Sequence, residues 1–158
     1  MAKLKVEIPE NSQNILGTTT INAPLEKVFG AYVDKGMFSK WIGGDIAVKV
    51  NVDTFDARSG GSWHMANTDK EGNVWKFGGS YHEVAKNERI IWTFEFLGMP
   101  ERGHVALERL DFVRVDDNTT EIRTTSTYQS VAERDNMVES GMEDGWRSSV
   151  ETLEKILQ

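Results

Sequence analysis

Residues 130–158, SVAERDNMVESGMEDGWRSSVETLEKILQ, form the stretch that decides the predicted fold. Its apolar residues recur every three or four positions, at Val138, Met142, Trp146, Val150, Leu153 and Leu157. This spacing predicts one helix of about 25 residues with a single apolar stripe, and Ser130 has the position of an N-terminal cap. Gly141 and Gly145 each cost roughly 1 kcal/mol inside a helix, so we expect a kink or an interrupted start near Ser140.

The region before this helix has a different pattern, in which short β-rich runs alternate with turn signals. After a first strand at 14–21 and two short helices between 24 and 42, the runs cover roughly 45–55, 61–67, 74–85, 88–97, 104–115 and 119–129. Strands joined by such short turns must be antiparallel, because parallel neighbours need a long crossover. We therefore predict an α+β fold: a curved antiparallel sheet of about seven strands with the long C-terminal helix packed across it.

The composition limits both the class of protein and its partners. The chain has 158 residues, which predicts a single domain over 1–158, with 1–13 as an arm or a frayed strand. It has no cysteine, a net charge of −7 and no basic run, so we expect no disulfide and no nucleic-acid partner. We also expect no membrane span and a cytoplasmic location, because neither a long apolar stretch nor a secretory leader is present.

Motifs for catalysis or for metal binding are absent from the sequence. The three histidines, His64, His82 and His104, do not have the spacing that places two metal ligands on one helix face. The glycine pairs are not followed by a phosphate-binding helix start, and no serine lies in a nucleophile elbow. We accordingly predict no metal and no cofactor.

Aromatic residues are the remaining signal, with five Trp distributed over different predicted elements. Strand 74–85 carries Trp75, Phe77, Tyr81 and Glu83 on one face by alternation. Strand 88–97 carries Ile90, Trp92, Phe94 and Phe96 on one face. Such stripes are typical of an ordinary core, and they are also typical of a cavity lined by rings, so both interpretations remain open at this point.

Four passages of the sequence resemble a known superfamily, the START-like or SRPBCC helix-grip domains. Within it, the chain is similar to the branch related to the activator of the ninety-kilodalton heat-shock chaperone ATPase. The four passages are INAPLEKVF at 21–29, FDARSGGSW at 55–63, GSYHEV with ERIIWT between 79 and 93, and GMEDGW at 141–146. The sequence departs from that family at 105–112, which carries more charge than is usual for this strand, and after Trp41, where Ile42 and two glycines suggest a differently shaped lid.

The resemblance implies a small-molecule binding protein that takes a hydrophobic or aromatic ligand between the sheet and the C-terminal helix. The residues expected to line that cavity are Trp41, Trp63, Trp75, Phe77, Tyr81, Trp92, Phe94, Met142 and Trp146. One alternative is an enzyme of the polyketide cyclase or aromatase kind, which needs an acid or base in the cavity. Its candidates are Glu83, which shares strand parity with Tyr81, then His64 and His82.

A third hypothesis is a co-regulator of the chaperone ATPase, by analogy with the branch's named member. We rank it last, because a shared fold does not transfer function within so varied a superfamily. We expect a hydrophobic small molecule as the partner and a monomer or homodimer; the sequence favours a binding protein over an enzyme and leaves the enzyme as the alternative.

Overall fold

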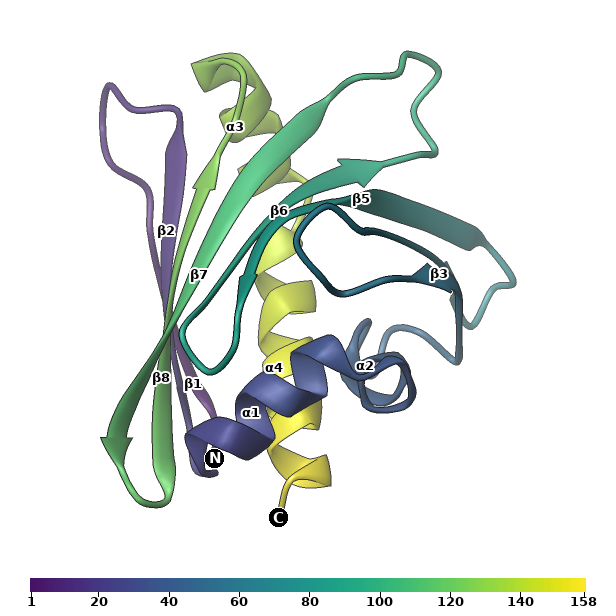
Figure 1. Ribbon diagram of the computed structural model, residues 1–158. Coiled ribbons are helices and arrows are strands. Elements are labelled where there is room, and N and C mark those ends of the chain that lie inside the picture. The colour runs from purple at the N-terminus through teal and green to yellow at the C-terminus, as the bar shows by residue number, and fades with distance from the viewer.

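The computed structural model describes residues 1–158 and contains one antiparallel sheet of eight strands in the order β1-β2-β8-β7-β6-β5-β4-β3 (Figure 1). Consecutive strands from β3 to β8 are neighbours, and β2 pairs with β8. The strands are β1 Lys3–Glu7, β2 Asn14–Ile21, β3 Lys49–Phe55, β4 Ser62–Thr68, β5 Val74–Ala85, β6 Arg89–Phe96, β7 Val105–Asp116 and β8 Thr119–Thr127. The predicted fold class is thus confirmed, with one strand more than expected.

The additional strand comes from the N-terminus. Residues 1–13 were expected to form an arm or a frayed strand, but Lys3–Glu7 pair along their whole length with β2. Arg134 holds the turn between these two strands, because its guanidinium donates to the carbonyls of Pro9 and Ser12 at 2.7 and 2.6 Å. The β1–β2 hairpin is therefore tied to the C-terminal helical region.

Four helices lie on the concave side of the sheet: α1 Leu25–Val33, α2 Lys35–Trp41, α3 Val131–Glu139 and α4 Met142–Ile156. The expected interruption of the C-terminal helix is present at Gly141, which has a φ of 83° between α3 and α4. α4 packs mainly against β1, β2 and α2, while α1 packs against β7 and β8. In Figure 1, α4 runs inside the curl of the sheet and α1 crosses in front of its C-terminal half.

The position of α4 is maintained by polar contacts as well as by its apolar stripe. The Oγ atoms of Ser148 and Ser149 accept hydrogen bonds from the backbone N–H groups of Asp45 and Gly43, at 2.9 and 3.1 Å. Glu154 accepts the backbone N–H of Asn22 at 2.8 Å. These contacts attach the helix to the loop after α2 and to the end of β2.

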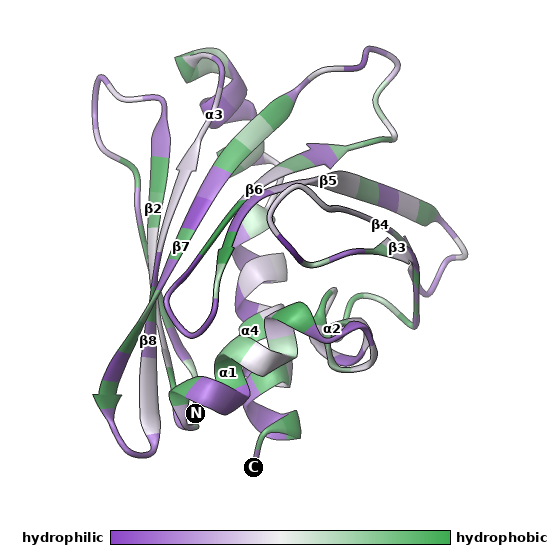
Figure 2. Ribbon diagram, in the orientation of Figure 1, coloured by the Kyte–Doolittle hydropathy of each residue, from purple (hydrophilic) through white to green (hydrophobic).

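Alternation along the strands separates a buried concave face from an exposed convex face, and Figure 2 shows apolar and polar residues alternating along β6 and β7. The concave face carries a main apolar cluster that includes Ile90, Trp92 and Leu110. A smaller second cluster contains Ile15, Ala106 and Tyr128, near α3. None of the four helices combines the length and the apolar character that crossing a membrane requires.

Candidate functional site

Seven aromatic side chains form a continuous line of ring contacts on the concave face, which we call the aromatic row. Successive centroids lie 4.8 to 5.8 Å apart along it. In order, its members are Trp75, Phe96, Phe77, Phe94, Trp63, Trp92 and Tyr81. Distances in this range and tilted or stacked orientations are the favoured geometry for aromatic pairs.

The row exists because strand register brings the rings from β4, β5 and β6 to one face. Phe77 is opposite Phe96, and Tyr81 is opposite Trp92. Gly79 lies between these two pairs on β5 and is opposite Trp63 of β4. Residues opposite one another in a sheet share a face, so the glycine leaves room for the rings on either side of it.

The inner end of the aromatic row is buried and its outer end is exposed. Tyr81 and Trp92 are 1% and 5% exposed, the three phenylalanines are half-buried, and Trp75 is 43% exposed. Because α4 packs mainly against β1, β2 and α2, the outer end of the row has no helix packed closely over it. The row therefore connects the interior of the concave face with the surface.

Trp75 is exposed but held in one orientation. Its indole Nε1 donates to Oδ2 of Asp69 at 2.9 Å, from the turn between β4 and β5. That hydrogen bond is the main reason why the pKa of the Asp69 carboxyl lies below its usual value. The charged acceptor strengthens the bond, so the ring at the outer end of the row is positioned before any ligand arrives.

An acidic side chain, Glu108 of β7, lies on the concave face beside the inner half of the aromatic row. Its Oε1 accepts the indole N–H of Trp92 at 2.9 Å, and its Oε2 accepts the hydroxyl of Ser126 at 2.7 Å. Burial raises the pKa of Glu108, and these two hydrogen bonds oppose that rise. No basic side chain forms an ion pair with it.

Glu108 is less buried than its neighbours on the concave face. Its neighbours on the concave face, Trp92, Ala106, Leu110 and Ser126, are at most 5% exposed. Glu108 itself, in the middle of them, is only partly buried. The acid is therefore not sealed off by the side chains that surround it on this face.

The predicted cavity-lining residues divide into three groups. Trp63, Trp75, Phe77, Tyr81, Trp92 and Phe94 all belong to the aromatic row. Trp41 instead lies in the core, where it is 3% exposed and its Nε1 donates to the carbonyl of Ala31 in α1 at 2.8 Å. Met142 packs against the second apolar cluster, and Trp146 covers Gly17 of β2 so closely that a Cβ there would lie 2.0 Å from the indole.

The expectation that Glu83 shares a face with Tyr81 is wrong. A bulge shifts the β5–β6 register between these two residues, so Val84 turns to the core and Glu83 turns outward. There its Oε1 accepts from Nε of Arg89 at 2.5 Å on the convex side. Alternation cannot be carried through a bulge, because the extra residue reverses the parity beyond it.

The two histidine candidates also lie away from the aromatic row. His64 alternates with the buried Trp63 and Met65 along β4, and its Nδ1 lies 2.6 Å from Oδ1 of Asp53. His82 is exposed on β5. The structure therefore does not gather the three predicted acid–base candidates at one place.

Sequence reasoning missed Phe96 and Glu108 as site residues. Phe96 follows the same alternation as Trp92 and Phe94, so the signal for it was present. Glu108 occupies the inward position of the series Ala106, Glu108, Leu110, where an apolar residue is expected. The unusual charge of this strand was therefore the available signal.

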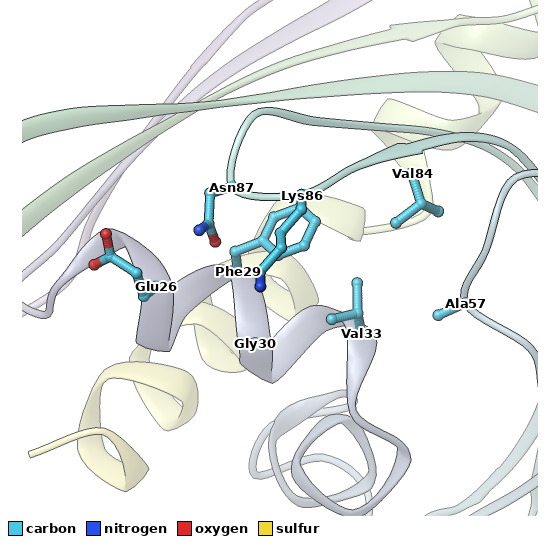
Figure 3. A pocket seen from close by; sticks show the side chains of 8 residues that line it. All are labelled: Glu26, Phe29, Gly30, Val33, Ala57, Val84, Lys86 and Asn87. Atoms are coloured by element: carbon cyan, nitrogen blue, oxygen red, sulfur yellow. The ribbon is translucent and has the colours of Figure 1, made fainter.

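Two hollows of about 490 Å³ each lie around α1, and neither includes a residue of the aromatic row. In the first, shown in Figure 3, side chains of α1 face Ala57, Val84 and the β5–β6 turn. Gly30 belongs to both hollows, and a Cβ built on it would meet no atom within 4 Å. The cavity expected between the sheet and the C-terminal helix is therefore not one of these hollows.

Gly30→Ala is expected to raise the free energy of unfolding by about 1 kcal/mol. The residue lies inside α1, where alanine loses less backbone entropy on folding than glycine, and nothing obstructs the added methyl group. Urea denaturation followed by circular dichroism measures the change. A variant less stable than the wild type would show that Gly30 has a structural role in α1.

The fold itself, an antiparallel sheet curled around a long C-terminal helix, is that of the helix-grip proteins of the SRPBCC superfamily. The sequence model of one of its families, described as activator of Hsp90 ATPase homolog 1-like protein, matches residues 22–158. The chain belongs to this family, as its four sequence passages indicated. A search of curated proteins found no significant match.

Solved structures with this architecture come from several bacteria. The Mycobacterium smegmatis protein Ms6760 superposes with a TM-score of 0.86 at 18% identity, covering 98% of this chain and 96% of its own. A protein from Staphylococcus epidermidis gives a TM-score of 0.80 at 27% identity, covering 95% and 92%. One from Arthrobacter aurescens gives 0.87 at 17%, covering 97% and 90%. At the lower identities these similarities establish the fold alone.

Proposed function

We propose that the protein binds a hydrophobic, aromatic small molecule along the aromatic row. The single observation that supports this most is that the row extends from the buried Tyr81 to the exposed Trp75. Rings needed only for the core would end where the core ends, whereas these continue to an open edge through the half-buried Phe77, Phe94 and Phe96.

The physical gain for such a ligand comes from two sources. Removing apolar surface from water contributes about 25 cal/mol per Å2, and stacking against an aromatic ring adds about 0.5 to 1.5 kcal/mol per pair. The rings are already in mutual contact, and Asp69 already orients Trp75. A planar ligand therefore loses little binding free energy to reorganisation of the protein.

The other two functions considered have less support from the residues. An enzyme of the cyclase kind was to use Glu83, His64 or His82, and these three lie on the convex side or at exposed positions. A role with the heat-shock chaperone would require a docking surface, and most rings of the aromatic row are buried or half-buried on the concave face. A small molecule can contact such rings more readily than the surface of a second protein can.

The proposal predicts that Phe96→Ala weakens ligand binding by about tenfold, because it removes one stacking partner and its apolar surface. Isothermal titration calorimetry with naphthyl alcohols, a flavonoid, a sterol and a long-chain fatty acid measures the affinities. Leu107→Ala is the matched control, since Leu107 is 47% exposed on the opposite face of the neighbouring strand β7. The absence of binding by every compound, or an equal loss in both variants, would contradict the proposal.

A further inference from the structure

Every group that faces Glu108 is neutral. Trp92 and Ser126 donate hydrogen bonds to its two oxygens. The phenols of Tyr32 on α1 and Tyr128 after β8 lie near enough that its charge adds to the effect of burial in raising their pKa. Buried charges in proteins are normally paired with an opposite charge, and here the chain supplies none.

The fold gives no structural reason for an acid at this position. Glu108 is one inward residue of β7, between Ala106 and Leu110, which both pack in apolar clusters. Its two hydrogen-bond partners, Trp92 on β6 and Ser126 on β8, are already its register partners in the sheet. The acid therefore does not join elements that would otherwise be separate. An apolar side chain would fill the same place without the desolvation cost of a carboxyl group.

We propose that Glu108 recognises a protonated amine carried by the aromatic ligand of the aromatic row; this inference rests on the function proposed above. The acid is only partly buried, and each of its oxygens retains a free lone pair after accepting one hydrogen bond. An ammonium group placed there completes the missing charge pair. The ligand class is therefore an aromatic ammonium ion.

The geometry connects the two parts of this ligand. Trp92 donates to Glu108 through its indole N–H and at the same time stacks on Trp63, at 4.8 Å between centroids and 26° between planes. A ring bound against the half-buried Phe94 lies near the carboxyl group, because Phe94 shares a face of β6 with Trp92, the register partner of Glu108. The net charge of −7 adds a long-range preference for cations over anions.

Three probes of equal size share the naphthyl ring and differ only in the charge of their side chain. They are 2-(1-naphthyl)ethylammonium, 2-(1-naphthyl)ethanol and 1-naphthylacetate, and the affinity of each is measured by isothermal titration calorimetry. For the wild-type protein we expect the ammonium probe to bind at least about tenfold more tightly than the alcohol, and the carboxylate to bind most weakly. Glu108→Gln should remove the preference for the ammonium probe and leave the affinity for the alcohol within about twofold.

Glu121→Gln is the matched control, because it removes the same charge from the convex face of β8, where Glu121 accepts from Arg123. It should keep the order of affinities, and circular dichroism shows that both variants are folded. Equal affinities for the ammonium and the alcohol in the wild type, or a preference that survives Glu108→Gln, would overturn this inference while leaving the proposed function intact. If none of the three probes binds, the proposed function fails first and this inference with it.

Discussion

Glu108→Gln is expected to raise the free energy of unfolding at pH 7 by about 1 to 3 kcal/mol. In the folded protein the carboxyl group is surrounded by neutral groups, so its charged form is poorly solvated. Glutamine has nearly the same shape. Its amide oxygen can accept from Trp92, and its amide nitrogen can donate to the hydroxyl of Ser126.

The difference in free energy of unfolding between Glu108→Gln and the wild type should increase with pH. The pKa of Glu108 is raised in the folded state above its ordinary value of 4.5. Well below pH 4.5 the group is protonated in both the folded and the unfolded chain, so the two proteins should be nearly equally stable. As pH rises above 4.5, ionisation favours the unfolded wild type, and the advantage of the variant grows until the folded-state pKa is passed.

Urea denaturation at a series of pH values from 3.5 to about 8 measures this difference. Glu121→Gln again serves as the control, since the same charge is removed from a position paired with Arg123 on the convex face. Its stability relative to the wild type should not rise across this range. A variant at position 108 that is less stable than the wild type at neutral pH would show that Glu108 is not an unfavourable buried charge.

Gly79→Ala is expected to lower the free energy of unfolding by about 3 kcal/mol. A Cβ at this position would lie 1.8 Å from the carbonyl oxygen of Thr93. That oxygen also accepts the indole N–H of Trp63 at 3.3 Å. Because the obstacle is backbone, the methyl group can be accommodated only if β5 moves away from β6 in the middle of the aromatic row.

The adjacent residue provides the control for this substitution. A Cβ at Gly78 would lie no closer than 3.2 Å to any atom, so Gly78→Ala should change the stability by less than about 1 kcal/mol. Thermal unfolding followed by calorimetry compares the two variants, and the quenching of Trp emission reports whether the stack of Trp63 and Trp92 is preserved. Equal stabilities of the two variants would contradict the close approach of the strands at Gly79.

Together, Gly79→Ala and Glu108→Gln distinguish effects on the free energy of unfolding from effects on ligand affinity. Gly79 determines the spacing of the strands that carry the rings, so its change should weaken both folding and ligand affinity. Glu108 should act in opposite directions on the two, because an unpaired acid destabilises the free protein and becomes favourable when a cation binds. Such an exchange of stability for binding is typical of functional sites.

The sequence by itself determined the fold class, the order of the elements and most of the aromatic row. Periods of two and of 3.6 residues depend on local geometry, so they are visible without any tertiary information. They predicted the strands, the apolar stripe of α4 and its interruption near Gly141. They also placed Trp92 and Phe94 on one face of β6, because no bulge interrupts that strand's pairing with β7.

Only the tertiary structure decided which of these residues form a site and what else belongs to it. The bulge after Tyr81 turned Glu83 outward, and Trp41 became part of the core, because pairing register and helix docking depend on contacts between distant segments. Glu108 was visible as an unusual charge on its strand, but its significance depends on what faces it. Partners from β6 and β8, and phenols from α1 and the end of β8, meet there only when the chain is folded.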